Sequence, residues 1–232
     1  TEEIEPEEGK KARASYFACV DFLDEMLGDF LATLEHAGLL ETTVIVYVSD
    51  HGEMAGEHGL WWKNTWHESS SRVPMIISTP EHRSGKQPAG EVTQPTSLAD
   101  IFPTLCDIAQ VPLPKGLDGI SLAPALRGET SADISNRVGV VTENLTPRWG
   151  AGTEFRMVRS ERFKYIAFRK CDDLAFDLES DPDEQINIAA DPKFENALAP
   201  LREYILGDFS FDDAVRAKTE QTVDLKNRFP AR

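Results

Sequence analysis

An acidic residue, a histidine and a lysine lie within one short stretch of the sequence, in an arrangement that can bind a cation and an anion. Asp50 and His51 directly follow the apolar run Val44–Val48, and Lys63 follows a loop that ends in two tryptophans. Carboxylate oxygen and imidazole nitrogen are ligands for divalent cations, and an ammonium group binds anions. Gly52 permits the backbone to turn, so that both side chains can reach one ion. An Asx turn beside a surface histidine is the alternative interpretation of the same pair.

A helix and a buried strand are expected to position this pair. Between Ala12 and His36, apolar side chains recur every three or four residues, which predicts an amphipathic helix that stops near Gly38. The run Val44–Val48 is typical of a strand covered on both faces, as in a parallel sheet flanked by helices. Ligands of open α/β sheets bind beyond the carboxyl ends of the strands, which is where Asp50 lies.

The character of the chain changes near Asn136. Residues 1–135 are predicted to form an α/β domain that includes a second strand at Arg72–Thr79 and a helix at Leu98–Ala109 capped by Thr96 or Ser97. Residues 136–232 are predicted to form a small α+β subdomain and a tail. Its expected elements are strands at Val138–Glu143, Glu154–Arg159, Phe163–Phe168 and Leu174–Leu178, a final helix at Lys193–Leu206, and a weakly patterned tail without an assigned element from Gly207 onward.

The composition restricts the partners of the protein. A net charge of -16 argues against non-specific binding to nucleic acid or to anionic membranes, although one local cation can still bind an anion. No apolar run has the length of a membrane span, and the first residues lack the apolar centre of a signal peptide. A periplasmic and a cytoplasmic location are both compatible with the sequence. Cys19, Cys106 and Cys171 are too widely spaced for a disulfide scaffold, and the first two are expected to be small buried side chains.

Further residues extend the motif beyond the Asp-His pair. They are Ser49-Asp50-His51-Gly52-Glu53, Gly56-Glu57-His58-Gly59-Leu60-Trp61, Lys63, Glu68 and Arg72-Val73-Pro74. This ordered series resembles the sulfatase family of the alkaline phosphatase superfamily. The resemblance continues through the helical segment Tyr16–Leu34, the segment Thr96–Gly119 and the segment Leu174–Glu184, so it covers most of the chain.

The resemblance implies a fold and a set of roles. The fold is α/β: part of an alkaline-phosphatase-like mixed or parallel sheet flanked by helices, followed by a small antiparallel sheet with a helix. Asp50 and His51 match a pair of metal ligands, and Lys63 matches the lysine that contacts the sulfate or phosphate group. His58 and His67 are candidate substrate contacts in the pocket loop. A calcium ion is the favoured cofactor, with manganese or magnesium as alternatives.

The family's nucleophile is a formylglycine made from a Cys/Ser-x-Pro-x-Arg motif, and no cysteine or serine of this sequence meets that pattern. The nucleophile and two further acidic ligands are therefore expected in a missing upstream half, and the chain alone is expected to be inactive. Its expected partners are that half or a second copy of the chain, besides an anionic ester substrate. A sulfate ester hydrolase is the first hypothesis. The alternatives are a phosphonate or phosphate ester hydrolase of the same superfamily and a non-catalytic binding or assembly module.

Overall fold

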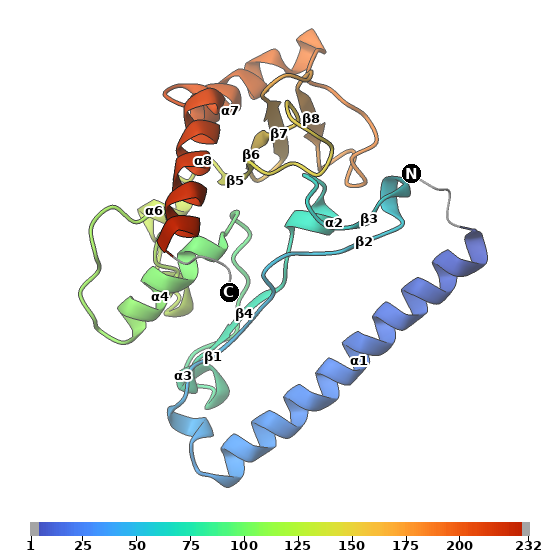
Figure 1. Ribbon diagram of the computed structural model, residues 1–232. Helices are drawn as coiled ribbons and strands as arrows, with labels where there is room; N and C mark the ends of the chain where they lie inside the picture. The colour runs from blue at the N-terminus through green and yellow to red at the C-terminus, as the bar shows by residue number, and fades with distance from the viewer. Residues whose placement is uncertain (1–4, 229–232) are drawn as a thin grey trace. The chain divides into compact units, whose positions relative to one another are not determined.

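The computed structural model describes residues 5–228 (Figure 1). The chain divides into two compact units, one running to Glu91 and including Leu126–Gly128, the other containing Val92–Ala125 and the residues from Glu129 onward. The predicted domain boundary after residue 135 stays a prediction. The outer ends of both predicted domains, residues 1–4 and 229–232, lie outside the described residues.

A long helix, α1 (Pro6–His36), opens the first unit. It begins before the predicted start at Ala12 because Pro6 occupies a first-turn position that needs no N–H donor, and Glu7 and Glu8 lie near the positive end of the helix dipole. The helix stops ahead of Gly38, whose φ of 68° lies in the left-handed region that glycine adopts without strain.

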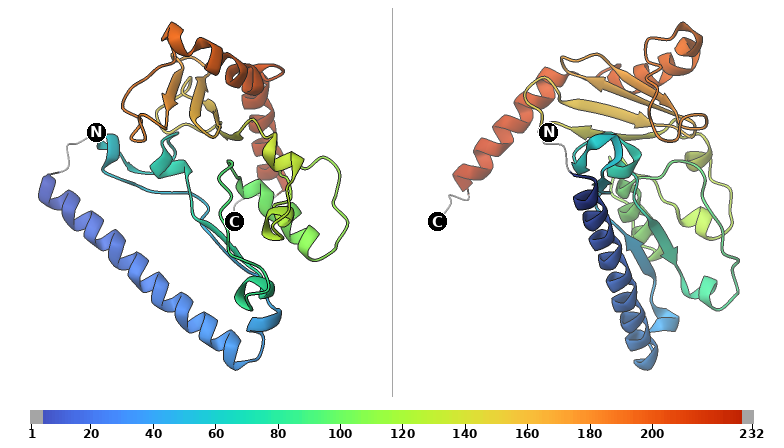
Figure 2. Two further views of the ribbon diagram at one scale, coloured as in Figure 1. Left: turned by 180° about the vertical axis from the view of Figure 1, so that it is seen from behind. Right: turned by 90° about the vertical axis from the view of Figure 1, so that its right-hand side faces the viewer.

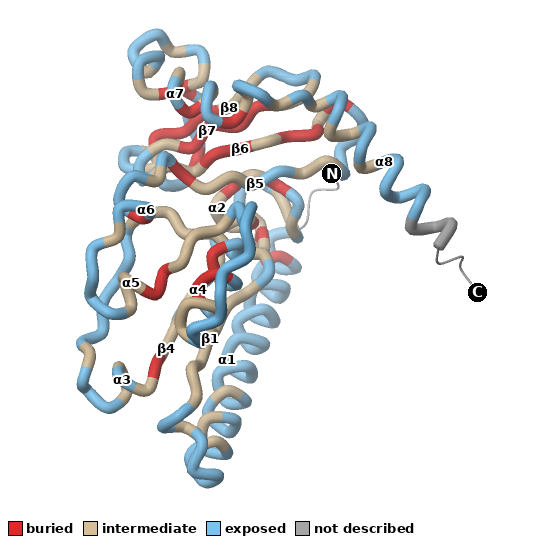
Figure 3. Tube along the Cα trace, turned by 90° about the vertical axis from the view of Figure 1, so that its left-hand side faces the viewer, coloured by how far each residue is buried: buried red, intermediate tan, exposed pale blue. Residues whose placement is uncertain are grey.

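Most of the apolar stripe of α1 is exposed (Figure 3). Within this stripe, the exposed fractions of Phe17 and Phe30 are 63% and 55%. Cys19 is exposed as well, so the prediction that it is buried is wrong. The reason is that the described residues of the first unit do not cover this side of the helix. Cys106 is partly buried.

The predicted strands of the first unit form one antiparallel pair. β1 (Ile45–Val48) pairs with β4 (Met75–Ser78), and Val48 lies opposite Met75. All four residues of β1 are half-buried. The expectation of a fully covered strand in a parallel arrangement is therefore wrong for the described residues, because a run of β-branched residues carries no information about strand direction. An antiparallel pair is compatible with the mixed sheet that was the other predicted form.

A groove of about 400 Å³ separates the middle of α1 from the β1–β4 pair. It is lined chiefly by Val20, Leu23, Leu27 and Leu31 on the helix and by Leu40, Ile45, Tyr47 and Ile76 on the other side. Near the start of α1, Nη1 of Arg13 donates a hydrogen bond of 3.1 Å to the carbonyl oxygen of Ala55.

Short elements complete the first unit. They are the 3-10 turns η1 (Leu40–Thr42) and η2 (Glu57–Gly59), the hairpin strands β2 (Met54–Ala55) and β3 (Trp61–Trp62), and the helices α2 (Glu68–Ser71) and α3 (Pro80–Arg83).

The second unit is built around a four-stranded antiparallel sheet in the order β5-β6-β7-β8. Its strands are β5 (Val140–Asn144), β6 (Phe155–Arg159), β7 (Phe163–Phe168) and β8 (Leu174–Asp177), which confirms all four predicted strands. After the turn η4 (Pro192–Phe194), helix α7 (Glu195–Leu206) lies against one face of the sheet (Figure 2). Its Leu198 and Ile205 pack against Val158 and Tyr165 of the sheet. The predicted helix at Lys193–Leu206 is confirmed, but it is not the final helix of the chain.

A buried aspartate organises the remainder of this unit. The predicted helix at Leu98–Ala109 is present as a 3-10 turn, η3 (Leu98–Asp100), followed by α4 (Ile101–Ile108), with Ser97 as the cap. Asp100 is fully buried, and both of its carboxylate oxygens accept hydrogen bonds of 2.7 Å from the guanidinium of Arg137. The short helices α5 (Ala123–Leu126) and α6 (Ala132–Ser135) follow.

The tail contains a helix where the sequence pattern predicted none. Helix α8 spans Phe211–Arg228. It has few apolar side chains, so a search for an apolar stripe misses it. Local signals do mark its start, because Ser210 Oγ accepts the backbone N–H of Asp213 and two aspartates occupy the first turn. No helix in the described part of the chain is long and apolar enough to cross a membrane.

Candidate functional site

The end of β1 delivers Asp50 and His51 into a tight turn. Ser49 Oγ donates a hydrogen bond of 2.8 Å to the carbonyl oxygen of His51, and Asp50 Oδ1 accepts the backbone N–H of His51 at 3.0 Å. The N–H of Gly52 donates to the carbonyl oxygen of Ser70 at 2.9 Å. A Cβ on Gly52 would lie 2.1 Å from the carbonyl oxygen of Ser69. This close approach of two backbone segments explains why a residue without a side chain occupies position 52.

The imidazole of His51 is oriented by its own backbone. Its Nδ1 lies 2.8 Å from the carbonyl oxygen of Gly52. A carbonyl oxygen only accepts, so Nδ1 carries the hydrogen and Nε2 has a free lone pair. That lone pair meets Nζ of Lys63, which can only donate. Imidazoles that bind metals in proteins are commonly held by such a bond from the other ring nitrogen.

Asp50 completes a small polar cluster with this histidine and lysine. Its Oδ2 lies 3.5 Å from Nε2 of His51, and its side chain is 83% exposed against 36% for His51. One carboxylate, one imidazole nitrogen and one ammonium therefore converge at the strand exit. Asp50 and His51 supply two donors of the types that hard and borderline cations accept. Among the described residues, no group of three or more His, Cys, Asp or Glu side chains gathers around one point.

The loop that carries Lys63 has an unusual backbone. The residues on both sides of it, Trp62 and Asn64, have φ values of 78° and 77°. Asparagine tolerates the left-handed region, whereas for a large residue such as Trp62 this conformation costs about 1–3 kcal/mol of strain energy. Such conformations concentrate where a side chain must be presented in a fixed direction. Backbone strain around Lys63 is thus consistent with a role for its ammonium group.

The two histidines of the loop lie together. The rings of His58 and His67 stack with their centroids 3.9 Å apart and an interplanar angle of 24°. His58 is exposed, whereas His67 is only 6% exposed. Thr65 Oγ1 lies 2.5 Å from Nδ1 of His67. Thr65 and Ser70 were not singled out from the sequence. The only local signal was a threonine two residues before a histidine at the start of a short helix.

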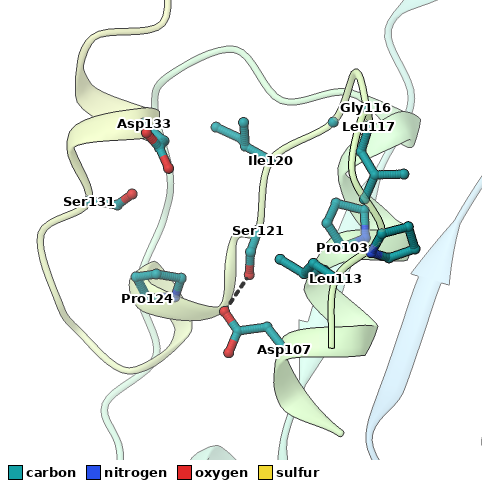
Figure 4. Close-up of a pocket in the computed structure, with 12 residues that line it drawn as sticks. Pro103, Asp107, Leu113, Gly116, Leu117, Ile120, Ser121, Pro124, Ser131 and Asp133 are labelled. Carbon is teal, nitrogen blue, oxygen red and sulfur yellow. Dashed lines mark hydrogen bonds between the residues drawn. The ribbon is translucent and has the colours of Figure 1, made fainter. Parts of the chain in front are cut away.

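A separate cavity of about 430 Å³ lies in the second unit (Figure 4). It is formed by α4, the loop after it and the start of α6, and Asp107 in its wall accepts a hydrogen bond of 2.8 Å from Ser121 Oγ. Its lining contains none of the five predicted site residues Asp50, His51, His58, Lys63 and His67. The candidate site is the cluster at the end of β1, where Asp50, His51 and Lys63 meet.

Sequence comparison relates the chain to proteins of one family. A family model described as Sulfatase matches residues 1–111. Arylsulfatase K of Bos taurus is 38% identical over 203 residues, which cover 83% of this chain and 35% of the relative. Choline-sulfatase of Rhizobium meliloti (strain 1021) is 34% identical over 197 residues, with 82% and 36% covered. The chain thus spans about a third of the length of these relatives.

A solved structure agrees with this result. The crystal structure of a phosphonate monoester hydrolase of Agrobacterium radiobacter superposes with a TM-score of 0.74 at 30% identity, covering 91% of this chain and 42% of the other. The predicted fold class, a mixed α/β arrangement followed by a small antiparallel sheet with a helix, is confirmed.

Proposed function

Because the chain belongs to the sulfatase family, we propose that it supplies one wall of the active site of a metal-dependent sulfate ester hydrolase. The observation that carries this proposal is the meeting of His51 Nε2 with Lys63 Nζ next to Asp50. These three groups lie near the end of a strand: the lone pair of His51, the carboxylate of Asp50 and the ammonium of Lys63. Together they can hold a divalent ion beside an anionic ester.

Each residue has a role in this proposal. Asp50 and His51 hold the metal, and the hydrogen bond from Nδ1 to the Gly52 carbonyl oxygen fixes the orientation of the imidazole ring. Bound there, a divalent ion supplies positive charge that polarises the ester oxygens. Lys63 pairs with the anionic group and stabilises the negative charge that grows during its transfer. His58, which is exposed, is the better placed of the two loop histidines to contact substrate.

The donor chemistry favours an oxygen-preferring cation. A carboxylate with one imidazole suits calcium, manganese or magnesium, and calcium is the proposed ion for a sulfatase. Two ligands rarely bind such an ion tightly by themselves. We therefore propose that further acidic ligands and a formylglycine nucleophile come from polypeptide outside this sequence, and that residues 1–232 alone do not turn over substrate.

The exposed face of α1 supports the same proposal. Its exposed aromatic side chains and the apolar groove beside them form a surface that costs free energy in water. The chain spans about a third of the length of its relatives, so we propose that additional polypeptide of the same protein covers this face. Self-association of the isolated chain is the alternative outcome.

A phosphonate or phosphate ester is the second candidate substrate. It is favoured by the likeness to the phosphonate monoester hydrolase of Agrobacterium radiobacter. Both substrate classes present tetrahedral anionic oxygens to Lys63, so this cluster alone does not separate them.

A turnover assay tests the proposal. Hydrolysis of an aryl sulfate and an aryl phosphonate is measured with calcium or manganese, for residues 1–232 and for the full-length protein that contains them. The expected result is activity only in the full-length protein, abolished by His51→Ala and reduced about 10²–10³-fold by Lys63→Ala. Lys86→Ala, at an exposed lysine of the same unit, is the control. Full activity of the full-length Lys63→Ala variant would contradict the proposed role, and activity of residues 1–232 alone would contradict the need for further polypeptide.

A further inference from the structure

Thr65 and His67 form a hydrogen-bonded pair next to the loop that carries Lys63. Both are buried, with exposed fractions of 5% and 6%. Thr65 Oγ1 lies 2.5 Å from Nδ1 of His67 and also accepts the backbone N–H of His67 at 3.1 Å. A threonine hydroxyl can donate and accept at once, so the pair satisfies two polar groups away from water. Thr65 is two residues from Lys63, so this pair restrains the end of the strained loop.

His67 also defines the start of α2. Its carbonyl oxygen accepts the backbone N–H groups of Ser70 and Ser71, each at 3.0 Å, and it is the N-cap residue of the helix. On its other side its ring stacks on His58. The histidine is therefore held by a hydroxyl, a ring and the first turn of a helix, and a change in its position would shift all three.

Helix α2 in turn contacts the turn that follows His51. The carbonyl oxygen of Ser70 accepts the N–H of Gly52 at 2.9 Å, and Ser70 Oγ accepts the N–H of Thr65 at 3.4 Å. The hydroxyl and the carbonyl of one residue thus join the Lys63 loop to the backbone next to His51. Gly52 lies so close to α2 that no side chain fits between them.

We infer that the Thr65–His67 pair is a positioning element that sets the spacing between His51 and Lys63. The inference rests on the proposed function for its biological meaning, because that spacing matters only if both groups act on one substrate. Neither residue needs to touch substrate. The pair acts through α2 and Gly52 on one side and through the backbone of the Lys63 loop on the other. Buried and hydrogen-bonded on several sides, His67 is better suited to this role than to substrate contact.

The test is a direct measurement of the His51–Lys63 proximity by NMR, without metal or substrate, on residues 1–232 in which Phe17 and Phe30 are replaced by serine to reduce association. The readout is the nuclear Overhauser effect between the ε-methylene protons of Lys63 and the Hε1 proton of the His51 ring. Thr65→Val keeps the shape and removes the hydroxyl, and the expected result is loss of this signal. Thr65→Ser restores the hydroxyl, and the expected result is its return. His67→Phe keeps a ring beside His58 without the nitrogen, and it serves as a second test if Thr65→Val does not fold.

The chain offers a matched control. Thr79 is also buried, and its Oγ1 lies 3.0 Å from Nδ1 of His82, away from the Lys63 loop. Thr79→Val removes the same kind of threonine–histidine bond, so it is expected to lower the melting temperature while leaving the His51–Lys63 signal intact. An unchanged signal in Thr65→Val, or an equal loss in Thr79→Val, overturns the inference. Because this readout needs no turnover, it is independent of whether the protein hydrolyses sulfate esters.

In the full-length protein, the same variants separate positioning from general destabilisation. Thr65→Val is expected to lower kcat/KM about tenfold or more, because small misplacements of a charge-stabilising group are costly. Thr65→Ser is expected to recover most of it. A loss in Thr65→Val that Thr65→Ser does not recover would count against the hydroxyl as the positioning group.

Discussion

Lys63 Nζ is a hydrogen-bond partner of His51 Nε2, across twelve residues of sequence that include a hairpin. The imidazole nitrogen has one lone pair, so it can accept a hydrogen from this ammonium or bind a metal ion but cannot do both at once. In the proposed site, the metal ion and the ammonium group of Lys63 therefore compete for the same atom, Nε2 of His51. Occupation by a metal would release Lys63 towards an anionic ligand.

This sharing predicts that Lys63 weakens metal binding by the isolated chain. Lys63→Met removes a positive charge and frees Nε2, so manganese is expected to bind more tightly, by about tenfold. The measurement is paramagnetic broadening of the His51 ring signals during a manganese titration. Lys86→Met serves as the control for a change of net charge. Equal broadening of the Lys63→Met variant and the unsubstituted chain would show that the lysine does not compete.

The approach of Gly52 to α2 predicts opposite effects for two glycine substitutions. Gly52→Ala places a methyl group against the carbonyl oxygen of Ser69 and is expected to lower the free energy of unfolding by about 1–3 kcal/mol. Gly28→Ala, in the interior of α1, meets no atom within 4 Å and is expected to raise it by about 0.5–1 kcal/mol. Urea denaturation of both variants checks this pair. A neutral Gly52→Ala would mean that the turn can move away from α2.

The second unit contains a fully buried ion pair, and its contribution to the free energy of unfolding can be measured. Lys164 Nζ donates to Glu184 Oε1 at 2.7 Å, and the side chains are 0% and 3% exposed. Lys164→Met leaves the Glu184 carboxylate without its ammonium partner and is expected to lower the free energy of unfolding by about 3–5 kcal/mol. Adding Glu184→Gln is expected to recover part of this loss, because the remaining group is then neutral. Denaturant titrations of the single and double variants measure these free energies. A double variant that is no more stable than Lys164→Met would argue against the ion pair as the cause of the loss.

The lowered pKa of Asp177 predicts that the protein loses stability in acid. The hydrogen bonds from the Arg162 guanidinium, with help from Ser180 and a backbone N–H, lower the pKa of Asp177 from 3.8 to about 2. Its folded-state pKa is below the unfolded value, so its stabilisation is present above about pH 4 and is lost as the pH falls from 4 towards 2. Denaturation of the unsubstituted chain between pH 5 and pH 2.5 is expected to show this loss. Asp177→Asn is expected to flatten that part of the curve, whereas Asp183→Asn, at an exposed aspartate, is not.

The exposed stripe of α1 predicts the behaviour of the isolated chain. Residues 1–232 are expected to bind a hydrophobic dye and to associate at micromolar concentrations, because aromatic side chains on this face lie in water. Replacing Phe17 and Phe30 by serine is expected to reduce both effects, whereas replacing Ile186, an exposed residue of the second unit, is not. Light scattering and dye fluorescence provide the measurement. A monodisperse monomer that binds little dye would contradict the prediction.

Local patterns predicted those elements whose cause is local. The four strands from Val140 to Asp177 alternate or carry β-branched and aromatic residues, and the apolar repeat of α1 extends over many turns. The patterns failed where the deciding factor lay elsewhere. Nothing in Val44–Val48 showed that β1 would pair antiparallel with β4, and Cys19 followed an apolar stripe that the described residues leave exposed.

The sequence by itself determined the family, the position of the Asp-His pair at the end of a strand, and the absence of a Cys/Ser-x-Pro-x-Arg motif within it. These follow from residue types at short spacing, which a linear chain carries directly. Only the tertiary structure decided that Lys63 reaches His51, that His67 is buried between Thr65 and His58, and that Gly52 lies against α2. Such contacts depend on left-handed residues folding a loop back on itself, and no pattern of hydrophobicity encodes where the returning backbone will meet the strand end.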